Sequence, residues 1–169
     1  MKQLTKTEIK RFKKKTSKHN KNIVIIAENV QYAKNVASLF RIADAVKVQK
    51  IILTGISRKP PFGKGLRKVS RNKEKSVHWE YSKHSGKPIN KLKRKGYQII
   101  GLELTDESQN YRNLDYPNKT CIVIGNETYG IVKTTLSKLE KAVYIPMYGK
   151  GASLNVTTSC AVLLYEIIS

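Results

Sequence analysis

Residues 22–55, NIVIIAENVQYAKNVASLFRIADAVKVQKIILTG, combine two short apolar runs with a helical pattern between them. The runs at 23–26 and 51–53 are rich in β-branched residues, which is typical of strands buried on both faces. From 34 to 45, apolar residues recur with the spacing of one helix face. A buried strand, a helix and a second buried strand predict two parallel strands joined by a crossover helix.

The same alternation continues through the rest of the chain. Further strands are expected at 99–100, 121–124 and 143–145, and further helices at 89–95, 134–139 and 154–168. The last helix is apolar almost all round, so it should be buried in the core or against another subunit. Residues 54–72 and 106–119 are expected to be irregular. The predicted fold class is α/β, with a mostly parallel sheet flanked by helices.

A length of 169 residues and a hydrophobic content of 40% suit one domain with its own core. Residues 1–21 differ in composition, because they set a few apolar side chains among many lysines. They are expected to form a basic N-terminal arm or a basic amphipathic helix, and the sequence leaves both open.

The chain carries a net charge of +21, and that charge is unevenly distributed. Residues 1–96 hold 27 lysines and arginines against 5 aspartates and glutamates, whereas residues 97–169 hold 6 against 7. A uniform mutational bias does not divide a single domain in this way. The basic part predicts a polyanionic partner, RNA or DNA, with residues 54–72 as a loop that contacts it.

Cys121 and Cys160 lie in apolar stretches without motif spacing, as buried reduced thiols do. The sequence has no apolar run of the ~18 residues that a membrane span needs. The lysine-rich first twenty residues contain no apolar signal segment. We therefore expect a cytoplasmic protein with no membrane partner and no metal site.

Three segments place polar residues and glycines near the ends of predicted strands, where open α/β sheets bind their ligands. They are NVQYAKNVASLFRIADA at 29–45, CIVIGNETYGI at 121–131 and IPMYGKGASLNVTTSCAVLLYE at 145–166. Asn35, Ser38 and Arg41 are three apart and offer an amide, a hydroxyl and a guanidinium to a phosphodiester. On the spacing alone, a capped surface helix with a solvated arginine is the better interpretation. Ser153 or Asn155 is expected to cap the last helix.

In this order, the three segments resemble the motifs of the SpoU/TrmH-type 2'-O-ribose RNA methyltransferases of the SPOUT superfamily. The likeness covers about residues 22–168, so residues 22–169 are expected to form a SPOUT-type methyltransferase domain. The resemblance implies a C-terminal trefoil knot, S-adenosylmethionine bound in the knotted loops, and a homodimer that completes each active site. It also implies methyl transfer to a ribose 2'-hydroxyl of RNA, with tRNA favoured over rRNA.

The resemblance also assigns the site residues. Arg41 matches the catalytic arginine, Asn35 its supporting asparagine, and Glu127 the glutamate of the second motif. Ser153 and Asn155 match the third-motif residues near the reacting centre. The expected cofactor-binding residues are Leu102, Glu103, Gly125, Ile145, Met147, Ser153 and Leu154.

The sequence departs from the family pattern at two places. Ala37 stands where glycine is usual, and its methyl group is expected on a helix surface that approaches the ligand or the partner. Residues 46–47 are Val-Lys where Phe-Gly is common. Neither change removes a polar motif residue.

Two roles are open for Arg41 and two for Glu127. A guanidinium keeps its proton up to a pH of about 12, so Arg41 suits a clamp on the phosphate next to the target ribose. The family proposal adds that the arginine takes the hydroxyl proton. Glu127 could serve as the base instead, or orient Asn35 and Arg41 through hydrogen bonds.

The sequence also bears on two other classes of protein. A non-catalytic basic RNA-binding protein would explain the charge of the first 96 residues by itself, and it remains the alternative to the enzyme. A P-loop nucleotide enzyme is excluded, since no GxxxxGK[ST] pattern occurs.

Overall fold

The computed structural model describes residues 1–15 and 19–169 of the chain. Within them, seven strands form one sheet in the order β3-β2-β1-β6-β4-β7-β5. The strands are β1 Asn22–Glu28, β2 Lys50–Thr54, β3 Trp79–Ser82, β4 Gln98–Leu102, β5 Gln109–Asn110, β6 Lys119–Ile124 and β7 Lys141–Tyr144. Every pair of neighbouring strands is parallel. The predicted parallel sheet is confirmed.

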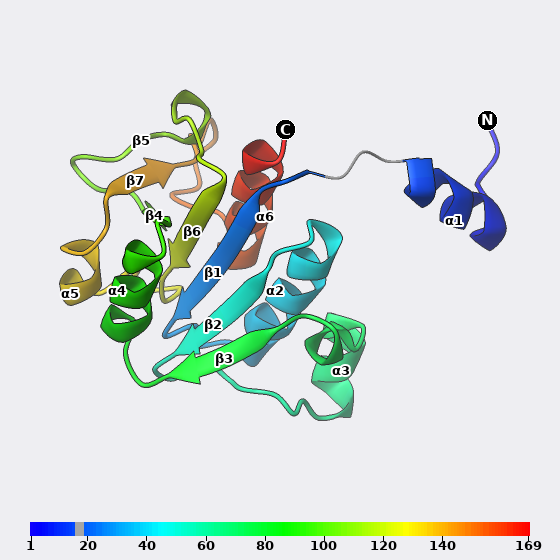
Figure 1. Cartoon of the computed structure of the whole chain (residues 1–169), viewed down its shortest axis with the longest axis horizontal. Coiled ribbons are helices and arrows are strands. Elements are labelled where there is room, and N and C mark those ends of the chain that lie inside the picture. The colour runs from blue at the N-terminus through cyan, green and yellow to red at the C-terminus, as the bar shows by residue number, and fades with distance from the viewer. Residues whose placement is uncertain (16–18) are drawn as a thin grey trace.

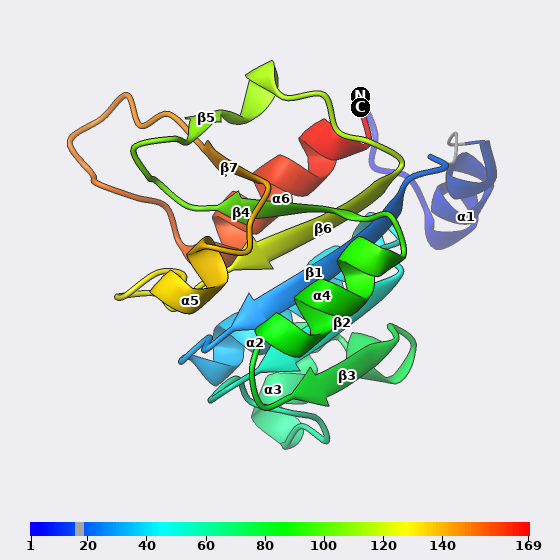
Figure 2. The ribbon, with the colours of Figure 1, turned by 60° about the vertical axis from the view of Figure 1, so that its left-hand side comes forward.

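Helices cover both faces of the sheet (Figures 1 and 2). The described helices are α1 Lys6–Lys15, which lies apart from the sheet, and α2 Ala33–Ala45, α3 Lys64–Ser70, α4 Gly86–Arg94, α5 Lys133–Leu136 and α6 Val156–Ile167. Two 3-10 turns, η1 Lys73–Lys75 and η2 Tyr111–Asn113, complete the described structure. Helices α2, α3 and α6 pack on one face, and α4 and α5 pack on the other. Among the described helices, none has the length and apolar character to cross a membrane.

The core is divided between the two faces by the alternation of side chains along β1. Ile23 and Ile25 pack toward α2 and α6, whereas Val24 and Ile26 pack toward α4. Every residue of β1 after the first is buried. The apolar run is continuous because a central parallel strand is covered on both sides.

The order of the strands reverses at the middle of the sheet. The chain runs from β1 outward to β2 and β3. The later strands, β4 to β7, lie on the other side of β1, and β6 is the one that pairs with it. Ala27 of β1 pairs in register with Ile124 of β6 at this switch point. Ligands of open α/β sheets bind beyond the carboxyl ends of the strands at such a point.

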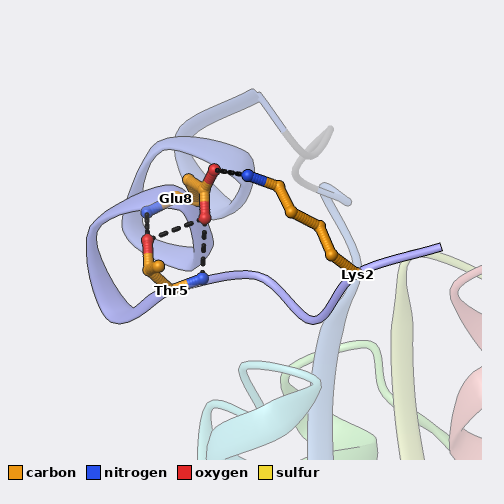
Figure 3. A network of polar contacts seen from close by, with 3 residues as sticks. All are labelled: Lys2, Thr5 and Glu8. Carbon is orange, nitrogen blue, oxygen red and sulfur yellow. Dashed lines mark hydrogen bonds and ion pairs between the residues drawn. The ribbon is translucent and has the colours of Figure 1, made fainter.

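For residues 1–21, the sequence left open an arm or a basic helix. In the structure, residues 6–15 of this segment form helix α1. Figure 3 shows why it begins at Lys6: the Glu8 carboxylate accepts from the backbone N–H of Thr5 at 2.7 Å, and Lys2 approaches it at 3.5 Å. The Glu8 N–H donates to the Thr5 hydroxyl at 3.4 Å, completing a capping box. No residue of α1 is buried. Residues 16–18 of the expected arm lie outside the described residues.

Several expectations are corrected. Residues 54–72 are not irregular throughout, because Lys64–Ser70 forms α3. The stretch 106–119 contains β5 and η2, and β3 was not predicted. Ala37 is not on an exposed helix surface. It lies on the buried face of α2, so its methyl group packs in the core instead of facing a ligand. The trefoil knot stays a prediction.

Candidate active site at the carboxyl ends of the central strands

Glu127 connects the first two motif segments. Its carboxylate accepts from the Asn35 side-chain amide at 2.7 Å, from the Gln31 N–H at 2.8 Å and from the Tyr32 N–H at 3.2 Å. Gln31 and Tyr32 precede α2, which has no side-chain cap of its own. The glutamate on the loop after β6 therefore supplies acceptors to the free N–H groups at the start of this helix.

The same contacts set the acidity of Glu127. Desolvation by partial burial, the largest single influence, raises its pKa, but the hydrogen bonds from Asn35, Gln31 and Tyr32 together lower the pKa below its ordinary value. Hydrogen bonds to the charged form of a carboxylate favour ionisation. Glu127 is thus a negatively charged acceptor at neutral pH, and its lowered pKa makes it a weaker base.

Asn155 connects the third segment to the first. Its side-chain oxygen accepts from the backbone N–H of Thr157 at 2.9 Å and of Thr158 at 3.4 Å, so it caps α6. Its amide donates to the Asn35 side-chain oxygen at 3.2 Å. Of the two expected caps, the structure therefore selects Asn155, and Ser153 is exposed in the preceding loop. A continuous chain of hydrogen bonds runs from Glu127 through Asn35 to Asn155.

Arg41 lies farther along α2 and is not part of this chain of hydrogen bonds. Its side chain is exposed, and it forms no ion pair or hydrogen bond with any residue that the structure describes. The core-facing residues of α2 are Val36, Ala37, Leu39, Phe40 and Ala43. Arg41 belongs to the outer side of the helix and is available to an anionic ligand.

The turn after β6 requires glycine at both of its ends. Asn126 and Gly130 exchange backbone hydrogen bonds of 3.0 and 2.9 Å, and a Cβ on Gly125 would lie 2.2 Å from the carbonyl carbon of Gly130. Gly130 has a positive φ of 65° and lies against the Glu103 carboxylate, which accepts from the Ile131 N–H at 2.9 Å. Glu103 and Gly125 were both expected at the cofactor, and both contact the end of the turn after β6, at Gly130 and Ile131.

The remaining expected cofactor residues lie at the ends of two adjacent strands and in the loop that follows β7. Leu102 ends β4 beside Val143 of β7, and Ile145 comes next after that strand. The following loop carries Ser153, together with Met147 and Leu154, whose exposed fractions are 37% and 39%. No described contact joins Ser153 to the hydrogen bonds around Glu127.

The residues at this edge fit an adenosine-containing cofactor. Nucleoside sites combine apolar side chains with a few main-chain polar groups. Large apolar side chains are exposed around the ends of β4, β6 and β7, namely Leu104, Tyr129, Met147, Tyr148 and Leu154. The strands end here in irregular loops, whose main-chain groups are available to hydrogen-bond a base and a ribose.

Two polar residues at this edge were missed in the sequence. Glu28 ends β1 and is only 3% exposed; its carboxylate accepts from the Val132 N–H at 3.0 Å and from the Thr135 hydroxyl at 2.6 Å. Asn126 donates to the Asn29 carbonyl at 2.9 Å and holds the turn against β1. An acidic residue that closes an apolar run is a usable signal, because a buried charge must be paired.

Comparison with known proteins gives consistent matches. The model of the SpoU rRNA Methylase family matches residues 22–165. The tRNA (guanosine(18)-2'-O)-methyltransferase of Aquifex aeolicus is 31% identical over 162 residues, which are 94% of this chain and 74% of that protein.

Two solved structures share the fold. The A. aeolicus TrmH/SpoU tRNA modifying enzyme has a TM-score of 0.78 at 29% identity, over 95% of this chain and 81% of that one. The SpoU methyltransferase AviRb of Streptomyces viridochromogenes, solved in complex with AdoMet, has a TM-score of 0.78 at 20% identity, over 92% of this chain and 62% of that one. The family match covers the sheet and all three motif segments, and the chain belongs to the SpoU rRNA Methylase family.

Proposed function

We propose that this protein transfers a methyl group from S-adenosylmethionine to a ribose 2'-hydroxyl of tRNA. The observation that carries the proposal is the chain of hydrogen bonds from Glu127 through Asn35 to Asn155, which joins three distant segments at the switch point of the sheet. The substrate follows the relative that is 31% identical and is named as a tRNA (guanosine(18)-2'-O)-methyltransferase. Guanosine 18 of tRNA is therefore the first position to test.

When bound, S-adenosylmethionine supplies an electrophilic methyl group that an oxygen nucleophile takes by in-line displacement. Leu102, Glu103, Gly125 and the loop from Ile145 to Leu154 would hold it. The exposed guanidinium of Arg41 would bind the phosphate beside the target ribose and fix the 2'-oxygen in place. The hydroxyl proton must also leave, and we propose Arg41 as its acceptor: beside the RNA phosphate, the guanidinium would first release a proton to water and then take the proton of the 2'-hydroxyl. Glu127 suits this role less, because its pKa is lowered and its carboxylate already accepts three hydrogen bonds.

The basic N-terminal segments would supply RNA recognition. Helix α1 ends in Lys13, Lys14 and Lys15, and no residue in it is buried. Helix α3 adds exposed basic side chains within the stretch that was expected to contact RNA. We expect deletion of residues 2–15 to weaken RNA binding more than binding of S-adenosylmethionine, with tRNA titrations and calorimetry as the measurements.

The homodimer and the cytoplasmic location are proposals of the same kind. Tyr165 of α6 is 57% exposed, and Val162 of the same helix and Ile168 directly after it are half-buried, which leaves apolar surface for a second copy. Light scattering of the purified protein would give twice the mass of 19.2 kDa. The two cysteines are free thiols, as expected in the cytoplasm, where tRNA is processed.

The test is incubation of the protein with methyl-labelled S-adenosylmethionine and total RNA, followed by nuclease digestion and nucleoside analysis. Arg41→Ala is the inactive control. A labelled 2'-O-methylnucleoside in tRNA that depends on Arg41 supports the proposal. Label in rRNA alone supports the rRNA alternative. If the protein shows no methyl transfer and does not bind the cofactor, the result supports a non-catalytic RNA-binding protein. If Arg41→Lys keeps near-normal turnover at neutral pH, the role of Arg41 as proton acceptor is wrong.

A further inference from the structure

A second cleft opens at the carboxyl edge of the sheet, on the face covered by α4 and α5. It has a volume of about 500 Å³, which lies within the roughly 300–1,000 Å³ of small-molecule sites. Its lining includes Glu28, Asn29, Lys83, His84, Gly86 and Lys138. None of the expected site residues lines it.

The lysines of this cleft form none of the ion pairs found among the described residues. Within residues 1–15 and 19–169, the ion pairs engage Lys2, Lys50 and Lys73, and neither Lys83 nor Lys138. The one carboxylate in the lining, Glu28, is already bound to Val132 and Thr135. Two lysines therefore line the cleft without an ion-pair partner, beside one carboxylate that neutral donors hold in place.

The start of α4 adds to this positive field. Its first turn contains no acidic residue, and no side chain caps it, because the Ser85 hydroxyl pairs instead with the Thr54 hydroxyl at 2.9 Å. The Lys138 chain lies across this start: its Cε is 3.3 Å from where a Cβ on Gly86 would be. A lysine at the positive end of a helix is unfavourable by itself and becomes favourable when an anion lies between them.

We propose that this cleft binds a backbone phosphate of the RNA substrate, held by Lys83, Lys138 and the free backbone N–H groups at the start of α4. The inference rests on the proposed function for the identity of the ligand as RNA. The cleft shares Asn29 with the candidate active site, since the Asn29 carbonyl accepts from Asn126. One RNA strand that crosses the carboxyl edge could therefore occupy both places.

The test compares two double variants of equal charge. Lys83→Gln with Lys138→Gln empties the cleft of its lysines. Lys95→Gln with Lys141→Gln removes two exposed lysines at the other ends of α4 and of the sheet. Binding of an in vitro transcribed tRNA is measured by fluorescence anisotropy over a range of salt concentrations, and binding of S-adenosylmethionine by calorimetry.

We expect the first double variant to bind the tRNA about tenfold more weakly, with a salt dependence reduced by about 0.7–0.9 per lost phosphate contact. The second should bind like the wild type, and both should bind S-adenosylmethionine normally. Equal tRNA affinities and salt slopes for the two double variants overturn the proposal. Because binding is the readout, a wild-type protein without methyl transfer would refute the proposed function and leave this comparison intact.

A second measurement uses inorganic phosphate alone as the probe. In the wild type, the amide resonance of Gly86 should shift in nuclear magnetic resonance spectra as phosphate is added. The shift should be absent in Lys83→Gln with Lys138→Gln and present in the control double variant. A Gly86 amide that does not respond in the wild type also overturns the proposal.

Discussion

Replacement of Glu127 by glutamine tests whether this side chain holds the start of α2 in place. Glutamine keeps the shape of glutamate but has one acceptor oxygen and no charge. The carboxylate accepts three hydrogen bonds, from the Asn35 amide and from the N–H groups of Gln31 and Tyr32. In the variant, at least one of these donors faces the new amide group and loses its acceptor.

The cost follows from those contacts. A hydrogen bond to a charged group contributes about 1.5–3 kcal/mol and a neutral one about 0.5–1.5 kcal/mol. One bond is lost and the others lose their charge, at a site partly open to water, so we expect the free energy of unfolding to fall by about 2 kcal/mol. For a chain of this size, that corresponds to a fall of about 4–8 °C in melting temperature.

The pH dependence has a defined sign. The folded-state pKa of Glu127 lies below its ordinary value of 4.5, so its stabilising effect is complete above pH 4.5. That effect is lost as the pH falls through the lower folded-state pKa. The difference in unfolding free energy between wild type and Glu127→Gln should therefore be constant at pH 6–7 and shrink in more acidic solution.

The assay is urea unfolding followed by circular dichroism at several pH values, with Glu107→Gln as the control. Glu107 is exposed and forms no side-chain hydrogen bond or ion pair with the described residues, so its variant should unfold like the wild type. An equal unfolding midpoint for Glu127→Gln and wild type at pH 7 would refute the reasoning. Methyl transfer should fall in Glu127→Gln, with little change in the affinity for S-adenosylmethionine.

Three further variants and one reagent test other contacts. Asn155→Ala should lower the free energy of unfolding in urea by about 1 kcal/mol, because α6 loses its cap; Asn155→Asp keeps the cap but loses the donor to α2, so it should retain stability and lose methyl transfer. Gly125→Ala places a Cβ 2.2 Å from a neighbouring backbone carbon, and the forced shift should cost about 1–3 kcal/mol in thermal unfolding. Burial raises the pKa of both thiols, to about 12 for Cys160; at pH 8, neither Cys121 nor Cys160 should react with a thiol dye until the protein is denatured, and rapid reaction of the native protein would contradict their burial.

The central strands were predictable and the edge strands were not, for a physical reason. β1, β2 and β6 are covered on both faces, so they consist of continuous apolar runs that stand out in the sequence. β3, Trp79–Ser82, lies at the edge of the sheet and no residue in it is buried. It is held by pairing with β2, and that leaves little pattern in its own residues.

Ala37 shows how a comparison with a family can mislead about position. A substitution of the usual glycine suggested a surface that touches a ligand, but Ala37 lies three residues before Phe40, on the same helix face. Both are fully buried. The helical period alone would have predicted Ala37 in the core, where its methyl group adds to the packing.

One role left open for Glu127 was to orient Asn35 and Arg41 through hydrogen bonds, and among the described residues it bonds to Asn35 and not to Arg41. The link from Asn35 to Asn155 came only from the fold. Asn35 and Glu127 are 92 residues apart in the chain, and Asn35 and Asn155 are 120 apart. Local spacing cannot predict contacts at such separations. These contacts form because the carboxyl ends of parallel strands all lie at one edge of the sheet. The loops that follow the strands are therefore close together there.

The same contacts bear on which side chain accepts the hydroxyl proton. A base must have a free acceptor, and the Glu127 carboxylate already accepts hydrogen bonds that lower its pKa. Protonation of Glu127 would weaken the anchor of α2 at the moment of reaction, which would displace the helix that carries Arg41. Arg41 has no described partner and can meet the RNA phosphate directly. We therefore expect the two residues to have separate tasks: Glu127 stays charged and fixes α2, and Arg41 is the proposed acceptor of the hydroxyl proton.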